Sequence, residues 1–441
     1  MRAATGRWLG AVIVASVVVR LGAAIGLGNE VVPLPGTWDQ VSYDALARRV
    51  AGGHGFSFAE DWWPLTRAEE PTAHWSYLYT LWLAGVYAVV GFQPGVARLL
   101  QAAAVGVVAP WLTWRLGRRV AGDRVAVVAA AMCAGYLYFV YYAAALVTES
   151  AYVCGVLASL ESAAMLADRL SQPAAGRQVL GSALVLGACL AVTVLLRQVF
   201  LLVVPLLAVW LIWAGVRAEG RRGGLRAAGA LLPAFALLAL AVAPFTAYNH
   251  ARFGRFVLLN TNAGFAFYWG NHPIHGTSFQ SILPDGGPSY ASLIPDELRG
   301  LDEASLEREL LARGLATVRA DPWRYVVLSL DRSKDFFKFW PSRTSSAVSN
   351  LARILSFGLL LPLLVAGLRP TLAVLLGAED QGRRVMILLL AFALAYTLVH
   401  LLTWTLIRYR LPVDAVLLVV GALGLDRCAG WLGLWGTEPA R

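Results

Sequence analysis

Long apolar runs, separated by short segments that carry arginine, recur along the whole chain. The hydrocarbon core of a bilayer is about 30 Å thick, and an α-helix of about 20 apolar residues spans it. About ten runs suit that role, and they cover 8–28, 97–115, 125–146, 151–167, 179–196, 199–216, 227–247, 351–368, 385–404 and 411–426. Charged residues make up only 15% of the chain, against about 25% in soluble globular proteins. We therefore expect an all-α polytopic membrane protein.

The arginines between the runs predict the orientation. They gather at the N-terminus and in the loops after the second, fourth, sixth and eighth runs, which all fall on one side of the membrane. Cytoplasmic loops carry an excess of Lys and Arg, so we expect an inner (plasma) membrane protein with both termini in the cytoplasm. The net charge of +10 then reflects membrane insertion, and nucleic acid is not an expected partner.

Two apolar segments allow a second interpretation. The run 8–28 could be a cleaved signal peptide, but it is long for one and Arg20 interrupts it, so we expect an uncleaved span. The segment 77–91 could be an eleventh span, but it is short, and counting it would place the later arginine-rich loops outside. We expect this segment to be a helix at the outer interface, a level that suits its tyrosine and tryptophan side chains.

The chain divides into three parts. Residues 1–247 form an N-terminal membrane module whose first outer loop is 29–96, and residues 351–441 form the last membrane helices. Between them, residues 248–350 form an extracytoplasmic loop. Its stretch 302–319 places leucine and alanine at helical spacing between charged residues, which predicts amphipathic helices.

Two acidic residues on the predicted outer side are candidates for chemistry. Asp39 precedes a short amphipathic segment, where an aspartate is commonly a helix N-cap, but a carboxylate there can also act as a general base. Tyr43 follows one helical turn later, on the same face. Glu149 lies in the very short outer turn between the third and fourth runs, and an ionisable residue at that depth suggests function unless it is simply a solvated turn carboxylate.

Three arginines lie at outer ends of runs, against the usual charge bias. They are Arg197, Arg408 and Arg410. Planar guanidinium groups bind phosphate through paired hydrogen bonds, so a lipid-linked phosphate is a candidate ligand. The alternative is that these side chains reach outward to lipid headgroups. His272 and His275 give a weak indication of a metal, because no third ligand is visible beside them.

In their order along the chain, these motifs resemble the GT-C membrane glycosyltransferases, in the branch of protein mannosyltransferases and bacterial lipid A aminoarabinose transferases. The stretch from Asp39 to Tyr43 is similar to that family's first-loop acidic motif, and Thr148-Glu149 is similar to its acidic second outer loop. Segment 71–91 is similar to the second juxtamembrane helix, although its opening at His74 lacks the family's double proline. Similar correspondences hold for the large outer loop over 249–271, its closing helices over 321–340 and the arginine-tyrosine motif at 408–412.

The resemblance implies a GT-C-type bundle with outer juxtamembrane helices and a large outer loop. It further implies transfer of a hexosyl or pentosyl group from a polyprenyl-phosphate carrier to an acceptor outside the cytoplasm, which could be an envelope lipid, a polysaccharide or a protein. Asp39 would be the base, assisted by Glu149, and the three arginines would hold the donor phosphate. The residues expected to contact the acceptor or other parts of the substrate are Tyr43, His74, Tyr77 and Tyr409. No metal and no other cofactor is expected.

The competing interpretation is a transporter or flippase for a lipid-linked glycan. Transporters often have inverted repeats and broken helices at the midplane of the membrane, and neither is visible in this sequence. A non-catalytic scaffold is a third interpretation. The enzyme interpretation requires Asp39 and Glu149 to lie close together, on one face of the membrane.

Overall fold

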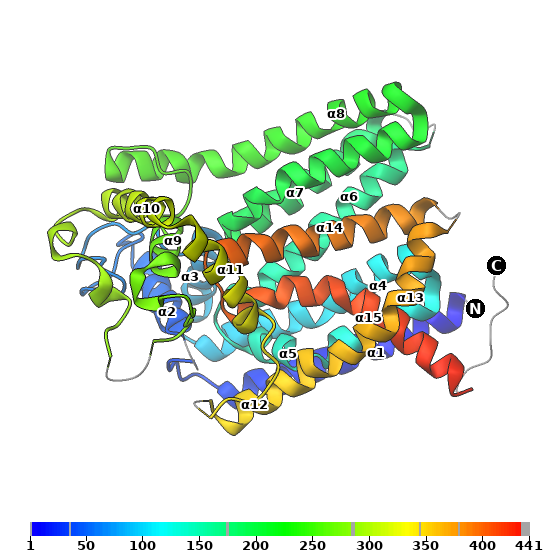
Figure 1. Ribbon diagram of the computed structural model, residues 1–441, viewed down its shortest axis with the longest axis horizontal. Coiled ribbons are helices and arrows are strands. Elements are labelled where there is room, and N and C mark those ends of the chain that lie inside the picture. The colour runs from blue at the N-terminus through cyan, green and yellow to red at the C-terminus, as the bar shows by residue number, and fades with distance from the viewer. Residues whose placement is uncertain are drawn as a thin grey trace.

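The computed structural model describes residues 2–34, 37–172, 176–283, 287–343, 345–377 and 380–433. Figure 1 shows a bundle of long helices with shorter helices and loops gathered at one end, which we call the loop end. The start of the first helix and the end of the last helix lie at the opposite end. Over the described ranges, extended pairing is limited to three isolated bridges. The predicted all-α class is therefore confirmed.

Ten helices make up the bundle and its connections within these ranges. They are α1 (Arg2–Leu27), α4 (Pro94–Gly135), α5 (Leu137–Ala144), α6 (Glu149–Leu170), α7 (Gly176–Leu196), α8 (Val204–Phe253), α12 (Ala347–Arg353), α13 (Leu359–Leu376), α14 (Asp380–Leu402) and α15 (Leu411–Trp431). Seven helical segments of the described chain are long and apolar enough to cross a membrane. One of them joins α12 to α13 through the π-helical turn Ile354–Gly358.

Two of the seven segments are helical hairpins. In α4 the chain reverses at Ala121 and Gly122, where the φ angle of Gly122 is 81°. In α8 it reverses at Glu219 and Gly220, where the φ angle of Gly220 is 61°. Both values lie in the left-handed region that glycine adopts without steric cost. The hairpins thus supply four of the predicted runs, and each of the ten predicted runs falls on helical structure.

The two arms of each hairpin pack closely because small residues face each other. A Cβ atom added at Gly117 would lie 3.1 Å from the Cα atom of Ala126 in the other arm of α4. In α8, a Cβ atom at Gly215 would lie 2.5 Å from the carbonyl oxygen of Gly223. Close backbone approach at small residues is the usual way for membrane helices to associate.

Among the described residues, five α-helices lie at the loop end, and the residues that precede them explain where several of them begin. They are α2 (Asp39–Ala51), α3 (Tyr77–Val90), α9 (Ala263–Asn271), α10 (Glu303–Ala320) and α11 (Pro322–Phe336). Ser76 caps α3 by accepting a hydrogen bond from the Tyr79 backbone N–H, and Asp302 caps α10 in the same way. Helices α10 and α11 lie within 248–350, where the sequence predicts amphipathic helices.

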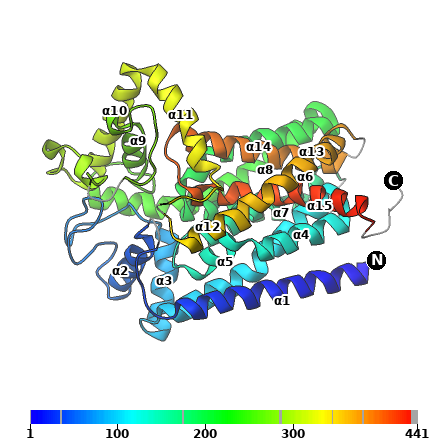
Figure 2. The same cartoon turned by 60° about the horizontal axis from the view of Figure 1, so that its bottom comes forward.

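Helix α3 is the segment that could have been an eleventh span. It has 14 residues, and Figure 2 shows it running across the end of the bundle rather than along it. Its aromatic side chains Tyr77, Tyr79 and Tyr87 are buried against neighbouring elements. The structure therefore agrees with a helix that lies across the bundle end.

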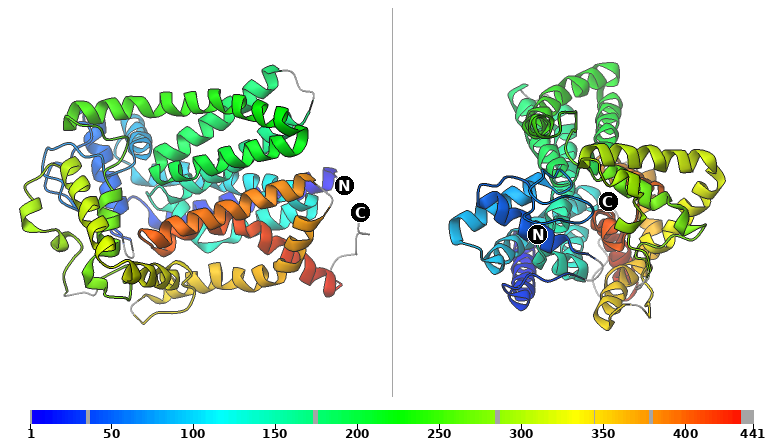
Figure 3. Two further views of the ribbon diagram at one scale, coloured as in Figure 1. Left: turned by 45° about the horizontal axis from the view of Figure 1, so that its top comes forward. Right: turned by 90° about the vertical axis from the view of Figure 1, so that its left-hand side faces the viewer.

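The first outer loop and the 248–350 segment are joined by a buried carboxylate. Seen from the loop end (Figure 3, right), the first outer loop, in blue, and the 248–350 segment, in green to yellow, occupy adjacent sides of the bundle end. Glu303 at the start of α10 accepts hydrogen bonds from the Thr66 and Thr72 hydroxyls and the Ala73 N–H at 2.7–2.9 Å, and from the Thr261 hydroxyl at 2.6 Å. Because four donors satisfy it, this buried charge ties the two segments together.

Candidate active site at the loop end

The Arg408 side chain brings together the starts of two helices. Arg408 lies in the 3₁₀ turn η6 (Ile407–Arg410), which connects α14 to α15. Its Nη1 atom lies 2.5 Å from Oδ2 of Asp39, the first residue of α2, and 3.3 Å from Oε1 of Glu149, the first residue of α6. It also donates to the Thr37 hydroxyl at 3.0 Å. The structure thus places the two predicted acidic residues on one guanidinium group.

Asp39 is not a helix cap. The N-cap of α2 is Trp38, whose side chain makes no capping hydrogen bond. Instead, the Asp39 carboxylate points to Arg408 and is 21% exposed. Burial by itself would raise the pKa of Asp39, but Arg408 and the hydrogen bond with Thr37 outweigh it and lower that pKa. The N-cap interpretation is therefore wrong, and Asp39 is an ionised group at a helix start, where the helix dipole also favours negative charge.

Glu149 is more deeply enclosed than Asp39. Its side chain is 2% exposed, and its Oε1 atom lies 2.6 Å from Nη2 of Arg197. Arg197 follows the end of α7 and is held by a 2.9 Å hydrogen bond from its Nε atom to the Thr148 hydroxyl. Glu149 is therefore not a solvated turn carboxylate but a buried carboxyl group paired with two arginines, and pairing is the condition under which such groups are buried.

Tyr409 forms an aromatic support for both arginines. The guanidinium carbon of Arg197 lies 5.4 Å from the centre of the Tyr409 ring, and that of Arg408 lies 5.6 Å from it. The ring centre of Tyr152 in α6 lies 5.6 Å from the guanidinium carbon of Arg197. An aromatic face attracts cations at these distances, so the rings hold two like charges near each other.

Tyr43 and His74 lie next to this cluster. The Tyr43 ring packs edge-on against Trp75 and Tyr79, and its hydroxyl accepts a 3.3 Å hydrogen bond from the Ser76 N–H. Burial raises the pKa of Tyr43, and the Asp39 charge adds to the rise. Burial lowers the pKa of His74, against the opposing influence of the Glu303 and Asp39 carboxylates. Both side chains are therefore neutral groups beside the ionised Asp39.

Two predicted site residues have partners elsewhere. Arg410 is fully buried and forms an ion pair with Asp414 of α15 at 2.9 Å, where the Tyr136 hydroxyl also donates to Asp414. The Tyr77 hydroxyl donates to the Asn249 side chain of α8. Within the described ranges, neither Arg410 nor Tyr77 shares an ion pair, hydrogen bond or ring contact with Asp39 or Glu149.

Thr37 and Tyr152, which the sequence did not single out, complete the cluster together with Thr148, which it named only as part of the Thr148-Glu149 motif. Thr37 and Thr148 fix the two arginines through their hydroxyl groups, and Tyr152 packs against Arg197. Thr148 directly precedes Glu149 and Thr37 lies two residues before Asp39. For Thr148, a hydroxyl side chain beside an acid just after the apolar run 125–146 was the available signal.

The histidine pair is occupied by backbone groups. His272 Nδ1 accepts from the Ile274 N–H, and His275 Nε2 lies 2.8 Å from the Trp269 carbonyl oxygen. In the part of the chain that the structure describes, His, Cys, Asp and Glu side chains do not gather in threes in a way that could hold a metal ion.

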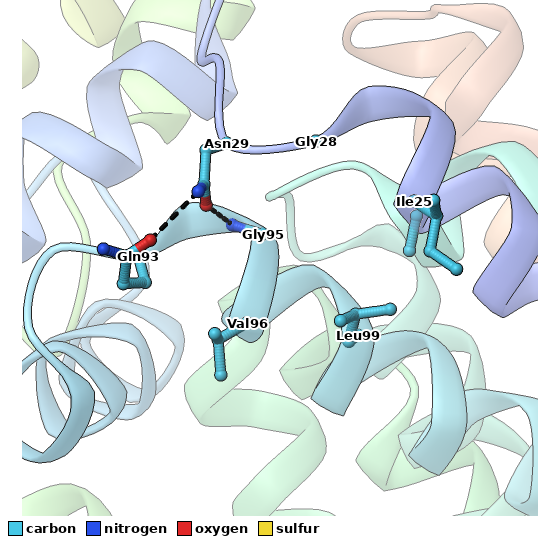
Figure 4. A pocket seen from close by; sticks show the side chains of 8 residues that line it. Ile25, Gly28, Asn29, Gln93, Gly95, Val96 and Leu99 are labelled. Carbon is cyan, nitrogen blue, oxygen red and sulfur yellow. Dashed lines mark hydrogen bonds between the residues drawn. The ribbon is translucent and has the colours of Figure 1, made fainter.

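A separate hollow lies where α1 meets α4. It is lined by Ala24, Ile25, Gly28, Asn29, Gln93, Gly95, Val96 and Leu99. At its rim the Asn29 side chain donates to Gln93 and accepts from the Gly95 N–H (Figure 4). None of the predicted site residues lines it.

Solved structures of membrane enzymes share this architecture. No family model matches the chain, and no curated protein matches its sequence. The archaeal oligosaccharyltransferase AglB from Archaeoglobus fulgidus, in complex with an inhibitory peptide and a dolichol-phosphate, matches with a TM-score of 0.59 and 18% identity over 97% of this chain. An oligosaccharyltransferase from the same organism, tethered to an acceptor peptide through a disulfide bond, matches with a TM-score of 0.59 and 16% identity, also over 97% of this chain. ArnT from Cupriavidus metallidurans, bound to undecaprenyl phosphate, has a TM-score of 0.36 and 14% identity, covering 96% of this chain and 78% of ArnT.

The likeness to the oligosaccharyltransferase establishes the fold. The chain spans about half the length of that enzyme, 51% and 50% of it in the two structures. The predicted all-α polytopic bundle is confirmed, and its fold is shared with the oligosaccharyltransferase structures.

Proposed function

We propose that this chain, whose fold is that of the GT-C membrane glycosyltransferases, transfers a hexosyl or pentosyl group from a polyprenyl-phosphate carrier to an acceptor outside the cytoplasm. The observation that carries the proposal is the convergence of Asp39 and Glu149 on Arg408, with Arg197 beside them. The oligosaccharyltransferase of the same fold was solved with a dolichol-phosphate, which is a polyprenol-type phosphate. We place the site on the periplasmic or extracytoplasmic face, because the arginine-rich loops lie at the other end of the bundle.

Asp39 is assigned as the general base. It is ionised and partly exposed, at 21%, so an incoming hydroxyl can reach it and give up its proton. As the acceptor oxygen bonds to the anomeric carbon, the bond from that carbon to the phosphate oxygen breaks. The proton passes to Asp39, and the configuration at the sugar inverts in this single displacement.

Arg408 and Arg197 are assigned to the leaving phosphate. Arg408 contacts Asp39, Glu149 and Thr37 through its Nη1 atom alone. Its buried Nε atom has no hydrogen-bond partner within the described ranges. Guanidinium donors placed where negative charge develops stabilise a transition state most effectively when little water is present. Glu149, paired with both arginines, keeps them in position, and the Tyr409 ring packs against both.

Arg410 receives a different assignment from the one that the resemblance implied. Because it is fully buried and paired with Asp414, we assign it to stabilising the turn that carries Arg408 and Tyr409. Tyr77, bonded to Asn249, is likewise assigned to holding α3 against α8.

The decisive experiment is transfer by the purified full chain in lipid nanodiscs. The donors are a panel of synthetic polyprenyl-phosphate hexoses and pentoses, and the acceptors are envelope lipid, polysaccharide and peptide extracts. We expect one donor to be consumed with release of polyprenyl phosphate, and consumption to be lost in Asp39→Asn. If liposomes containing the protein instead move the intact donor across the bilayer without releasing phosphate, the flippase interpretation replaces this one.

A further inference from the structure

Four aromatic side chains form a cluster beside the site. They are Trp63, His74, Trp75 and Trp269, and we call them the tryptophan cluster. The ring of Trp63 is centred 5.4 Å from that of Trp269, 5.6 Å from that of His74 and 6.4 Å from that of Trp75. The first outer loop and α9 both contribute to it, so the cluster exists only when the two outer segments are docked.

Trp63 differs from its neighbour Trp62. Trp62 stacks on Phe58 at 4.5 Å, and its indole N–H donates to the Ser42 hydroxyl at 2.9 Å. Trp63 is 44% exposed and meets the other rings of the cluster at angles between 32° and 90°. Trp62 thus fixes the loop to α2, whereas part of the Trp63 indole is exposed to solvent.

The other three members carry buried polar atoms without partners. Trp75, Trp269 and His74 are 6%, 5% and 8% exposed. Within the described ranges, the indole N–H groups of Trp75 and Trp269 and the Nδ1 atom of His74 have no hydrogen-bond partner. Buried indole N–H groups usually find one, and unsatisfied buried polar groups are few in native proteins. These three unpartnered polar atoms belong to rings that all pack against the partly exposed Trp63, and this combination indicates a binding site for a polar ligand.

The cluster is continuous with the Asp39 site. Trp75 packs against Tyr43 with ring centres 5.4 Å apart, and Tyr43 lies one helical turn after Asp39 in α2. Arg197 and Arg408, by contrast, lie next to the ends of bundle helices. A ligand on the tryptophan cluster therefore approaches Asp39 from the side of the loops, whereas a lipid-linked phosphate approaches from the bundle.

We propose that the tryptophan cluster binds a pyranose ring of the acceptor, so that the acceptor is a carbohydrate-bearing molecule. This inference rests on the proposed glycosyltransferase function. One face of a pyranose presents C–H groups that pack on an indole, and its rim presents hydroxyls that accept from indole N–H groups and donate to an imidazole nitrogen. Binding sites of this kind combine aromatic walls with a few well-placed polar groups. The sugar of the donor is the alternative source of such a ring.

Binding is tested without catalysis. Saturation-transfer NMR on the full chain in nanodiscs would use methyl α-D-mannopyranoside, methyl β-D-galactopyranoside and methyl β-D-N-acetylglucosaminide as probes. We expect at least one to bind, and Trp63→Ala to weaken that binding at least tenfold. The matched control is Trp323→Ala, which removes a tryptophan that is 74% exposed on α11 and should change nothing. No binding by the wild type, or equal binding by Trp63→Ala, overturns the proposal.

Transfer kinetics separate the two sources of the sugar. In Trp63→Ala we expect the KM for the acceptor to rise about tenfold, with kcat and the KM for the donor unchanged, and Trp63→Phe to restore much of the loss. A rise in the donor KM instead would overturn the assignment to the acceptor. Asp39→Asn should bind the probes as the wild type does. Loss of transfer in Asp39→Asn together with unaltered sugar binding in Trp63→Ala would sink this inference and leave the proposed function standing.

Discussion

Arg408 and Asp39 form an ion pair of 2.5 Å although 369 residues separate them in the chain. The pair joins the turn between the last two bundle helices to the first helix of the outer loop. Arg408 also lies close to Glu149. Replacing any one of Asp39, Glu149 and Arg408 therefore changes the electrostatic environment of the other two.

Replacing Asp39 by Asn should remove the base and leave the fold intact. A positioned general base contributes about 10²–10⁴-fold to rate, so we expect kcat to fall by that range at constant protein yield. Initial rates of polyprenyl phosphate release measure it. The control is Asp296→Asn, whose side chain is 97% exposed, and which should transfer at the wild-type rate. Wild-type kcat in Asp39→Asn would remove Asp39 from the mechanism.

The pH profile should report the Arg408–Asp39 pair. Asp39 accepts a proton only when it is ionised, so activity falls as the pH drops through its pKa. Although burial opposes it, Arg408 lowers that pKa. Removing the guanidinium in Arg408→Gln should therefore raise the pKa and move the acid limb of kcat to higher pH. Arg313→Gln, which removes a guanidinium that is 41% exposed on α10, should leave the limb in place. An unmoved limb in Arg408→Gln would contradict the coupling.

The Arg410–Asp414 pair should affect stability more than chemistry. Both side chains are 0% exposed, and breaking a buried pair from one side costs about 3–5 kcal/mol. We expect Asp414→Ala to lower the thermal midpoint markedly, and the double change Arg410→Met with Asp414→Leu to recover much of the loss. The exposed pair Arg226–Glu219, at 41% and 38%, is the control, because such pairs contribute about 0–1 kcal/mol. An unaffected midpoint in Asp414→Ala would show that the pair is not structural.

Glu303 should hold the outer segments together. Hydrogen bonds to a charged group contribute about 1.5–3 kcal/mol each, and Glu303 accepts four. In Glu303→Ala we expect limited proteolysis to cut faster within 54–75, with transfer reduced because His74 and Trp75 lose their support. Glu297→Ala, which removes a side chain that is 64% exposed, serves as the comparison. Equal cleavage of both variants would argue against a joint at Glu303.

The orientation can be measured by labelling single cysteines in intact cells. We expect Asp296→Cys at the loop end to react with a membrane-impermeant maleimide, and Arg221→Cys in the turn of α8 to react only after permeabilisation. The four native cysteines are buried or partly buried, and the unmodified chain gives the background. The reverse labelling pattern would place the site in the cytoplasm.

Local composition was sufficient to predict the helices of the bundle. A run of about 20 apolar residues has few alternatives to a helix, since backbone groups inside a bilayer must be satisfied within the segment. The ten runs were predictable for this reason, whereas α3 was predictable as a non-spanning helix from its short length and its tyrosine and tryptophan side chains. Asp39 was harder to interpret, because an aspartate before a helix is read as a cap unless the distant Arg408 that attracts it is known.

Only the tertiary structure separated residues that look alike in the sequence. Arg408 and Arg410 lie two residues apart in one turn, yet the first points to Asp39 and Glu149 and the second to Asp414. Tyr77 and His74 share one segment but face Asn249 and the tryptophan cluster respectively. Composition and hydropathy act locally and determine which segments become helices. The partners of a charged or aromatic side chain depend on which helices pack together across hundreds of residues, and that packing produced the site around Asp39.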